Sequence, residues 1–272
     1  MVRSLWSGAT GMIAQQTNVD TIANNLANVN TVGYKSEVNE FKSLLYQTLQ
    51  TQTTSANGNP KPVTSQVGLG VRNASISSVF TQGNLLSSEK TSSFAIEGEG
   101  FFSTRGADGN TYYTRNGDFT WAMNTGGGLV LTTSDGYPVL DSQGRTITLS
   151  NQYSSSKISI DDDGYICYPD NNNIPQRVGP QIGLAQFNNP NGLEKTGNSM
   201  YRTTAASGPA INEATSNNVK KSVLHQGYLE GSNVQVADEM VNLIVAQRAY
   251  EMNSKVITTS DSMMQVANEL KR

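Results

Sequence analysis

The 272-residue chain contains one cysteine and one histidine. A single cysteine excludes a disulfide framework within the chain. Cys167 lies in the apolar run 165–168 and is expected to be a buried, inert thiol in a strand. With His225 as the only histidine, a Ser-His-Asp triad or a histidine-rich metal site is hard to build. We expect His225 to be a partly exposed linker residue, and we predict no catalytic residue, cofactor or metal.

Long hydrophobic runs and a strong net charge are also lacking. Hydrophobic residues make up 36% of the chain, and the formal net charge is −3. No run approaches the ~18 apolar residues of a membrane-spanning helix, and no basic block suggests nucleic acid as a partner. No apolar run of about 7–15 residues follows Arg3, so a cleaved signal peptide is not expected. The protein is therefore expected in the cytosol, or exported by a route without a cleaved signal.

Glycine-rich motifs offer no clear ligand site. Residues 68–70 and 98–100 have Gly-x-Gly spacing but lack the strand-to-helix context of a nucleotide-binding loop. The acidic turn 161–164 ends in Asp-Gly. An Asp-Gly hairpin is expected there, because a calcium loop would need helices on both sides and an acidic first ligand. A weak cation site at this turn stays an alternative.

The last forty residues contain no proline, and no glycine follows Gly231. Ser232 and Gln235 have the spacing of a capping box, and Asp238 and Glu239 would lie in the first turns of a helix. We predict a helix of about 36 residues, roughly 54 Å long at ~1.5 Å per residue. Its small and apolar residues recur mostly at steps of four and three, as in a coiled-coil seam: Val234, Val241, Val245, Ala249, Met252, Val256, Thr259, Met263, Val266 and Leu270.

The N-terminal region has a weaker stripe with the same steps, at Leu5, Ala9, Met12, Gln16, Val19, Ala23 and Leu26. Gly8 and Gly11 each cost about 1 kcal/mol inside a helix, although they permit close helix packing. Two arrangements remain open: an antiparallel pair that closes one domain, or a bundle built from many copies. For the second we predict an assembly interface of Leu5, Met12, Val19, Leu26, Val241, Val245, Met252, Val256, Met263, Val266 and Leu270.

In the middle of the chain, short apolar runs alternate with Asp-Gly, Asn-Gly and Gln-Gly pairs, which suit tight hairpins. This pattern predicts an antiparallel β domain. Its candidate strands are Ser93–Ile96, Phe101–Thr104, Thr111–Thr114, Asp118–Ala122, Leu129–Thr133, Tyr137–Leu140, Thr146–Leu149, Lys157–Ile160, Tyr165–Tyr168 and Ile182–Phe187.

Two polar segments separate this domain from the helices. Residues 48–65 are predicted to form a long loop or extended arm, and residues 188–218 to lead back towards the last helix. The predicted fold class is therefore α+β, with two long terminal helices in a coiled-coil-like layer, an extended arm and a central antiparallel β domain. The predicted domains are 1–30 with 231–272, 31–88 with 188–230, and 89–187.

Five stretches together resemble the flagellar rod and hook axial proteins. The resemblance runs from Arg3 to the C-terminus and departs from the family at Val32, where proline is usual, and in the Ser-rich segment 87–93. The stretches are Asn24–Lys35 (NNLANVNTVGYK), Ile96–Phe102 (IEGEGFF), Tyr113–Phe119 (YTRNGDF), Gln226–Val234 (QGYLEGSNV) and Met240–Glu251 (MVNLIVAQRAYE).

The resemblance implies a structural role in the flagellar basal body. The length of the chain and the segment 45–70 favour the distal rod. The expected protein is exported by the flagellar export apparatus without a cleaved signal. It polymerises helically into a rigid tube that crosses the periplasm inside the P and L rings and transmits motor torque. Its other partners would be the proximal rod proteins and the hook protein.

Two alternatives remain. The nearer one is a hook or proximal rod axial subunit. The other belongs to a different class, an extracytoplasmic β-domain enzyme such as a cell-wall glycosidase, which would depend on an essential pair of carboxylates.

Overall fold

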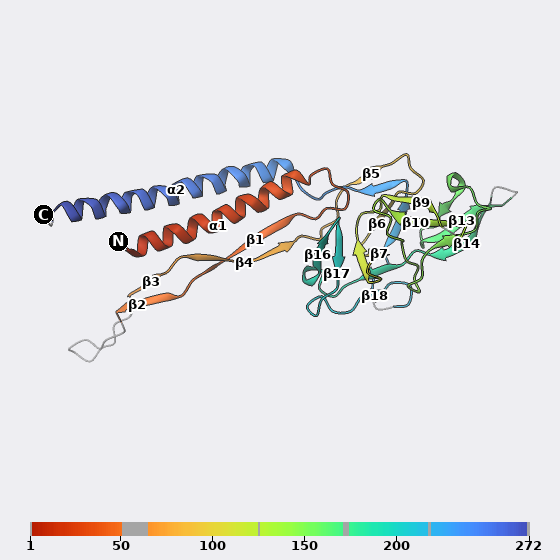
Figure 1. The fold of residues 1–272 in the computed structure, drawn as a ribbon, viewed down its shortest axis with the longest axis horizontal. Helices are drawn as coiled ribbons and strands as arrows, with labels where there is room; N and C mark the ends of the chain where they lie inside the picture. The colour runs from red at the N-terminus through yellow and green to blue at the C-terminus, as the bar shows by residue number, and fades with distance from the viewer. Residues whose placement is uncertain (1, 51–64, 125, 171–173, 217–218, 271–272) are drawn as a thin grey trace. The chain divides into compact units, whose positions relative to one another are not determined.

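The computed structural model describes residues 2–50, 65–124, 126–170, 174–216 and 219–270. These residues form two compact units (Figure 1). The first comprises residues 1–27, 37–78 and 235–272, and the second comprises residues 28–36 and 79–234. The segment 31–88 is thus shared between the two units.

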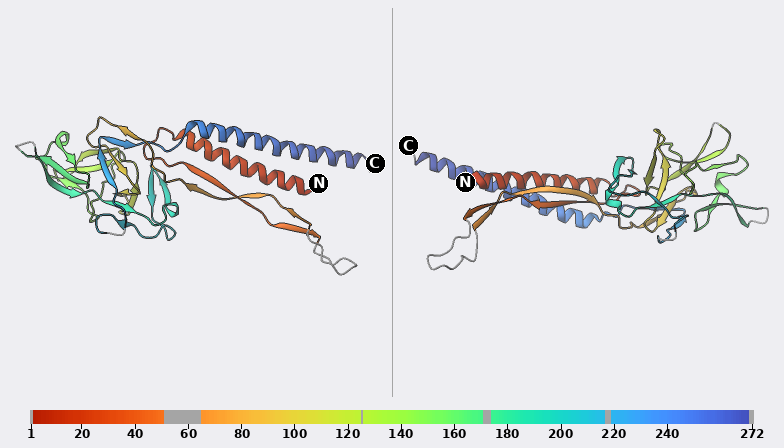
Figure 2. Two further views of the ribbon diagram at one scale, coloured as in Figure 1. Left: turned by 180° about the vertical axis from the view of Figure 1, so that it is seen from behind. Right: turned by 90° about the horizontal axis from the view of Figure 1, so that it is seen from below.

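The first unit contains the two terminal helices, α1 (Val2–Ala27) and α2 (Val236–Glu269). They lie side by side and antiparallel, with the two chain ends at the same end of the pair (Figure 2). Gly8 and Gly11 allow this close approach: a Cβ atom at Gly8 would lie 2.9 Å from Cγ1 of Ile257, and one at Gly11 would lie 2.8 Å from Nδ2 of Asn253. Two long terminal helices are therefore confirmed.

The predicted capping box is wrong. The helix α2 begins at Val236 with Gln235 at the N-cap, and no side chain caps it. Ser232 lies outside the helix, and its hydroxyl accepts a hydrogen bond from the Val234 N–H at 3.3 Å. The side chain of Asn233 explains the later start, because it accepts from the Ser36 N–H at 2.7 Å and donates to the backbone oxygen of Val79 at 2.8 Å. These bonds hold the chain in the β body until residue 234.

The first unit also contains a two-stranded antiparallel ribbon. Its inner part pairs β1 (Glu37–Ser43) with β4 (Val71–Ser78), and its outer part pairs β2 (Tyr46–Gln50) with β3 (Ser65–Gly68). Both β1 and β4 contact α1. The predicted arm 48–65 therefore has strands at its described ends, and these pair with each other. Its residues 51–64 lie outside the described part of the chain.

The second unit is a body of antiparallel strands, as predicted. Its largest sheet has six strands in the order β16 (Glu194–Gly197), β17 (Met200–Arg202), β8 (Thr111–Thr114), β7 (Phe101–Arg105), β15 (Leu184–Gln186) and β18 (Ile211–Asn212). Two three-stranded sheets have the orders β11 (Thr148–Leu149), β10 (Leu129–Thr133), β9 (Phe119–Met123), and β12 (Ser159–Ile160), β13 (Tyr165–Pro169), β14 (Pro175–Gln181). Two pairs join β19 (Val223–Gln226) to β6 (Phe94–Glu97) and β20 (Tyr228–Glu230) to β5 (Leu85–Ser87), and short 3-10 helices span Ser155–Lys157 and Pro190–Gly192.

Two predictions about this body are wrong. The predicted strand 137–140 makes only isolated bridges, such as Thr104 with Val139 and Leu140 with Thr146. The segment 188–218 was predicted only to connect the β domain to the last helix, but it contributes three strands to the six-stranded sheet. Sequence reasoning missed the strand β16 because its residues are all exposed and leave no alternating apolar pattern.

The hydrophobic core lies in this second unit and has two clusters. The larger one contains Phe94, Ile96, Phe102, Phe119, Leu131, Val139, Ile147, Leu149, Ile158, Ile166, Ile182, Leu184 and Leu224. The smaller one contains Phe101, Tyr113, Ala185, Phe187 and Tyr201, with several ring pairs in edge-to-face geometry. Cys167 is buried in β13, as predicted.

The predicted Asp-Gly turns are confirmed, and the predicted Asn-Gly turn at Gly117 is not formed. Gly109, Gly136 and Gly164 have φ angles of 80°, 84° and 82°, in the left-handed region that glycine tolerates. Gly117 is instead required by packing, because a side chain there would collide with the carbonyl of Phe94. Among the described residues, no helix is long and apolar enough to cross a lipid bilayer.

Candidate assembly site

The face of α2 that packs on α1 combines small and polar residues with Ile257, which lies against Gly8. Ala246 and Ser260 are the buried residues of α2, and the hydroxyl groups of Ser4 and Ser260 lie 3.0 Å apart. On α1 the matching face includes Gly8 and Gly11, which are also buried. The pairing of the two helices within one chain therefore leaves most of the apolar residues of α2 uncovered.

The predicted apolar stripe of α2 lies on this uncovered surface. The predicted interface residues at the C-terminal end of the chain expose between 46% and 84% of their area: Val241, Val245, Met252, Val256, Met263, Val266 and Leu270. Val234, which was predicted to begin the stripe, is instead buried and precedes the helix. The predicted residues of α1 are half-buried: Leu5, Met12, Val19 and Leu26. The structure thus brings the two sets onto neighbouring helices but does not pack them into one seam. Their role as an interface with another copy stays a prediction.

A shallow groove runs along part of this stripe. It has a volume of about 550 Å³, and its lining residues are Met252, Lys255, Val256, Thr259, Ser260 and Met263 of α2 and Ser4 of α1. Apart from the hydroxyl groups and Lys255, the lining is apolar. Exposed apolar surface of this kind marks sites of protein association.

Sequence reasoning missed further exposed apolar residues. Trp6 and Ile13 on α1 are 64% and 65% exposed, and Leu45 and Tyr46 on the ribbon are 83% and 61% exposed. The seven-residue interval between Trp6 and Ile13 is a helical repeat that could have been recognised. This repeat lies one residue away from the stripe that includes Leu5 and Met12.

Asn25 links three elements of the first unit and was also missed. Its side chain donates to the backbone oxygen of Glu37 at 2.8 Å and accepts from the Glu37 N–H at 2.8 Å. It also donates to Oε1 of Glu239 at 3.3 Å. Burial raises the pKa of Glu239, although the hydrogen bond from Asn25 opposes this. One carboxamide therefore connects α1, β1 and α2.

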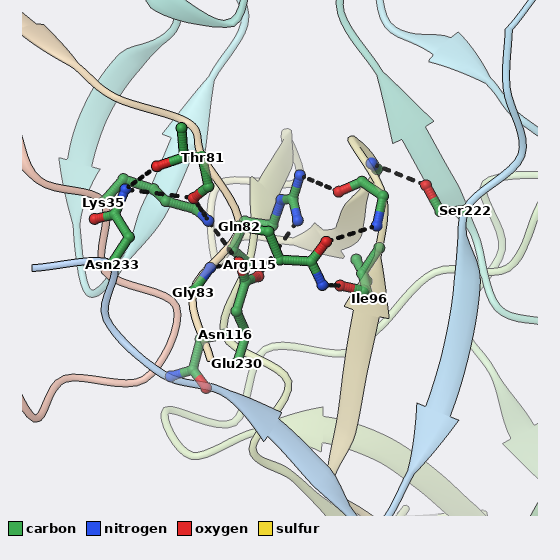
Figure 3. Close-up of polar contacts among 12 residues, drawn as sticks. Lys35, Thr81, Gln82, Gly83, Ile96, Arg115, Asn116, Ser222, Glu230 and Asn233 are labelled. Carbon is green, nitrogen blue, oxygen red and sulfur yellow. Dashed lines mark hydrogen bonds and ion pairs between the residues drawn. The ribbon is translucent and has the colours of Figure 1, made fainter. Parts of the chain in front are cut away.

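In the second unit, three charged side chains form a buried cluster (Figure 3). The Nζ atom of Lys35 lies 2.5 Å from Oε1 of Glu230, and Nη1 of Arg115 lies 3.3 Å from Oε2 of the same carboxylate. The side chains of Lys35 and Glu230 are fully buried, and that of Arg115 exposes 2% of its area. Such a network is expensive to bury unless every group has a partner.

Backbone groups add further hydrogen bonds to this network, although the buried Nε atom of Arg115 has no partner in the described part of the chain. Lys35 Nζ donates to the carbonyl of Thr81 at 2.7 Å, and Arg115 Nη2 donates to the carbonyl of Gly98 at 2.8 Å. The N–H of Gly83 donates to Oε1 of Glu230 at 3.1 Å (Figure 3). Two carbonyl dipoles thus offset the excess of positive charge over the single carboxylate.

Burial lowers the pKa of both cations. Desolvation lowers the pKa of Lys35, and the charge and hydrogen bond of Glu230 oppose that effect. The pKa of Arg115 is lowered for the same reason and with the same opposition. Glu230 therefore compensates two buried cations at once.

The acidic turn 161–164 is a hairpin held by an arginine. Nη2 of Arg177 lies 2.7 Å from Oδ2 of Asp161 and 3.1 Å from Oδ2 of Asp163. The hydrogen bond from Arg177 lowers the pKa of Asp161. Within the described ranges, no cluster of three or more His, Cys, Asp or Glu residues is placed to hold a metal ion.

The predicted linker position of His225 is wrong. This residue lies in β19, and its Nε2 atom is 2.6 Å from Oε2 of Glu97 on the paired strand β6. Its side chain is 33% exposed, so its partial exposure is as predicted. A strand of only four residues, such as β19, leaves too short an alternating pattern to be predicted from the sequence.

Three family models match separate parts of the chain. The flagella basal body rod protein model matches residues 5–35, the flagellar hook protein FlgE/F/G D1 domain model matches residues 95–168, and the flagellar basal body rod FlgEFG protein C-terminal model matches residues 225–270. The chain is 44% identical to the flagellar basal-body rod protein FlgG of Borreliella burgdorferi, over the full length of both chains. The chain belongs to the flagellar basal-body rod protein FlgG family.

Other relatives agree with this assignment. The FlgG protein of Bacillus subtilis is 39% identical over the full length of both chains, and the flagellar hook-basal body complex protein FlhP of the same organism is 31% identical over the same span. As a member of the FlgG family, the chain is a structural subunit of the flagellar basal-body rod. Lys35, Arg115 and Glu230 each lie in a different one of the three matched segments. The buried cluster therefore joins all three.

Proposed function

We propose that this FlgG-family chain forms the distal part of the rod, where it polymerises helically into a stiff drive shaft that carries torque from the motor to the hook. One observation supports this most directly. The apolar stripe of α2 is 46–84% exposed in a single chain, although α2 already packs against α1. Further copies of the chain would cover that stripe.

The same proposal assigns roles to the parts of the molecule. The helices α1 and α2 would form a coiled-coil-like helical layer, the ribbon of β1 to β4 would form the arm, and the remaining strands, including those between residues 188 and 230, would form one β domain. The predicted interface residues on both helices would lie between copies. A subunit that acts in this way needs no catalytic group.

The proposed partners follow from this position in the flagellum. They are further copies of the chain, the proximal rod proteins, the hook protein and the P and L ring proteins. The subunit would reach the periplasm through the flagellar export apparatus without a cleaved signal. The higher identity to FlgG proteins than to FlhP, 39–44% against 31%, favours the distal rod over another axial position.

The substitution Val256→Asp tests this function. Val256 is 46% exposed in the single chain, and in the polymer an aspartate there would be buried among packed helices. Burying an uncompensated charge costs several kcal/mol. We expect the purified variant to form no filaments in electron micrographs, while its far-ultraviolet circular dichroism shows that the β body is intact.

The matched control is Thr258→Asp. Thr258 is also exposed on α2, but two residues along a helix it points to a different face. The control should polymerise at nearly the wild-type protein concentration. Normal filaments from the Val256→Asp protein would contradict the proposal.

A further inference from the structure

The exposed side of α1 carries three residues in a line. Trp6, Ile13 and Asp20 follow each other at intervals of seven, which places them on one face of the helix. Trp6 and Ile13 are 64% and 65% exposed, and Asp20 is exposed as well. Tryptophan is among the residues that contribute most to binding when buried at the centre of an interface. An exposed tryptophan beside an isoleucine on the same line is therefore suited to docking.

The groove on α2 has a matching arrangement. Met263 and Val256 are seven residues apart in its wall, and Arg248 follows eight residues further towards the N-terminus of α2. The side chain of Arg248 is 75% exposed, and its ion pair with Glu251 at 3.1 Å is on the surface. Surface pairs of this kind contribute little, so Arg248 can exchange its partner at small cost.

The two lines match when the helices run antiparallel. With Trp6 beside Met263, Ile13 falls beside Val256. Asp20 then falls near Arg248, which the eight-residue step turns about 80° around α2 from Val256, towards the edge of the contact. The pairing then has an apolar centre and an oppositely charged pair at the rim, as in typical protein interfaces. Charge complementarity and spacing thus select the same register.

Within one chain the helices use another register and other faces. There Gly8 lies against Ile257 and Gly11 against Asn253, whereas Trp6, Ile13, Val256 and Met263 remain exposed. The α1 helix of the same chain therefore leaves the groove open, and the spacing and charges favour α1 of another chain as its occupant. Copies related by the screw operation of a filament keep the same direction along its axis, so α1 of one copy runs antiparallel to α2 of the next.

We infer that Trp6 and Ile13 of one copy dock into the α2 groove of a second copy, with Asp20 of the first beside Arg248 of the second. This inference rests on the proposed function, because it specifies one of the contacts that build the polymer. The two surfaces are different, so the contact is heterologous. Contacts of this type extend into filaments when the rotation does not close a ring.

Disulfide cross-linking between two single-cysteine proteins tests the register. Both proteins carry Cys167→Ser; one also carries Ile13→Cys and the other Val256→Cys. After the two are mixed, polymerised and oxidised, we expect a disulfide-linked dimer that neither protein forms alone. The control mixture pairs Ile13→Cys with Thr258→Cys, which points away from the groove, and should give at least tenfold less dimer.

A charge exchange gives an independent measurement. Asp20→Arg and Arg248→Asp should each raise the protein concentration needed for polymerisation by up to about fivefold, the range of an exposed ion pair. The protein with both changes should return close to the wild-type value. Trp6→Ala should raise the same concentration by about 30-fold or more, as expected for a buried anchor residue.

The outcomes separate the inference from the proposed function. Filaments that form normally but give no Ile13–Val256 cross-link, or no recovery in the charge exchange, would overturn the inference and leave the rod function standing. Equal cross-linking to position 258 would also overturn it. Failure of the wild-type protein to form filaments at any concentration would overturn both.

Discussion

At the scale of single residues, the buried charge cluster is the feature that the sequence concealed. Lys35, Arg115 and Glu230 are 195 residues apart at most along the chain, yet their charged atoms lie 2.5 and 3.3 Å apart. Each belongs to one of the motifs that identified the family. The motifs could be recognised from the sequence, but their meeting at one carboxylate depends on the tertiary fold.

The substitution Glu230→Gln keeps the size of this side chain and removes its charge. Two buried cations would then lack a counter-charge, so we expect the free energy of unfolding to fall by about 3–5 kcal/mol. Urea-induced unfolding, followed through Trp121 fluorescence in a Trp6→Phe background, measures the change. The chain has two tryptophans, so Trp121 is then the only one.

The control for this measurement is Asp118→Asn. Its carboxylate pairs with Lys90 at 2.9 Å, but the two side chains are 33% and 57% exposed. Removing such a surface pair should change the free energy of unfolding by less than about 1 kcal/mol. Similar small losses in both variants would show that the cluster does not stabilise the body.

At the scale of elements, a sequence pattern predicts which segments form helices but not which of their faces pack together. Steps of four and three residues predicted α2 and its apolar stripe, and both are present. The pattern could not show that α1 would pack against another face of α2, with Gly8 and Gly11 against Ile257 and Asn253. Small residues give almost no hydrophobic signal, because their contribution is close approach of the backbones.

The ribbon leads to a mechanical prediction. Deleting Thr48–Ser65 would remove its outer end, including parts of β2 and β3, and leave both helices intact. We expect the shortened protein to polymerise through its helices into a tube that bends more easily. An arm that bridges neighbouring subunits would resist bending, and strand edges are suited to such pairing.

The measurement is the persistence length of the filaments in electron micrographs. It should be shorter for the deletion variant than for the wild type. A deletion variant whose filaments are as stiff as wild type would show that the arm has no mechanical role. Loss of polymerisation altogether would contradict the assignment of assembly to the helices.

At the scale of the whole molecule, the chain consists of two units that differ in how much buried apolar surface stabilises them. The second unit holds both hydrophobic core clusters. The first has helices that approach each other closely at Gly8 and Gly11 and whose apolar stripe is exposed. The stability of the first unit should therefore depend on other copies far more than that of the second.

Limited proteolysis of the monomer tests this difference. We expect early cleavage to remove roughly the first 30 and the last 40 residues and to leave a β-rich fragment that contains residues 79–234. In the polymer the same sites should be protected, because neighbouring copies cover the helices. Full protection of both ends in a monodisperse monomer would argue against assembly-dependent order.

The sequence alone determined the α+β class, the two terminal helices, most strands between residues 93 and 187 and the family. These features depend on local periodicity, turn chemistry and motifs, which short stretches of chain encode. The tertiary structure decided the strands of segment 188–218, the start of α2, the strand position of His225 and the Lys35–Glu230–Arg115 cluster. Each of these depends on partners distant in sequence, and exposed strands or buried ion pairs leave no periodic pattern from which such partners could be inferred.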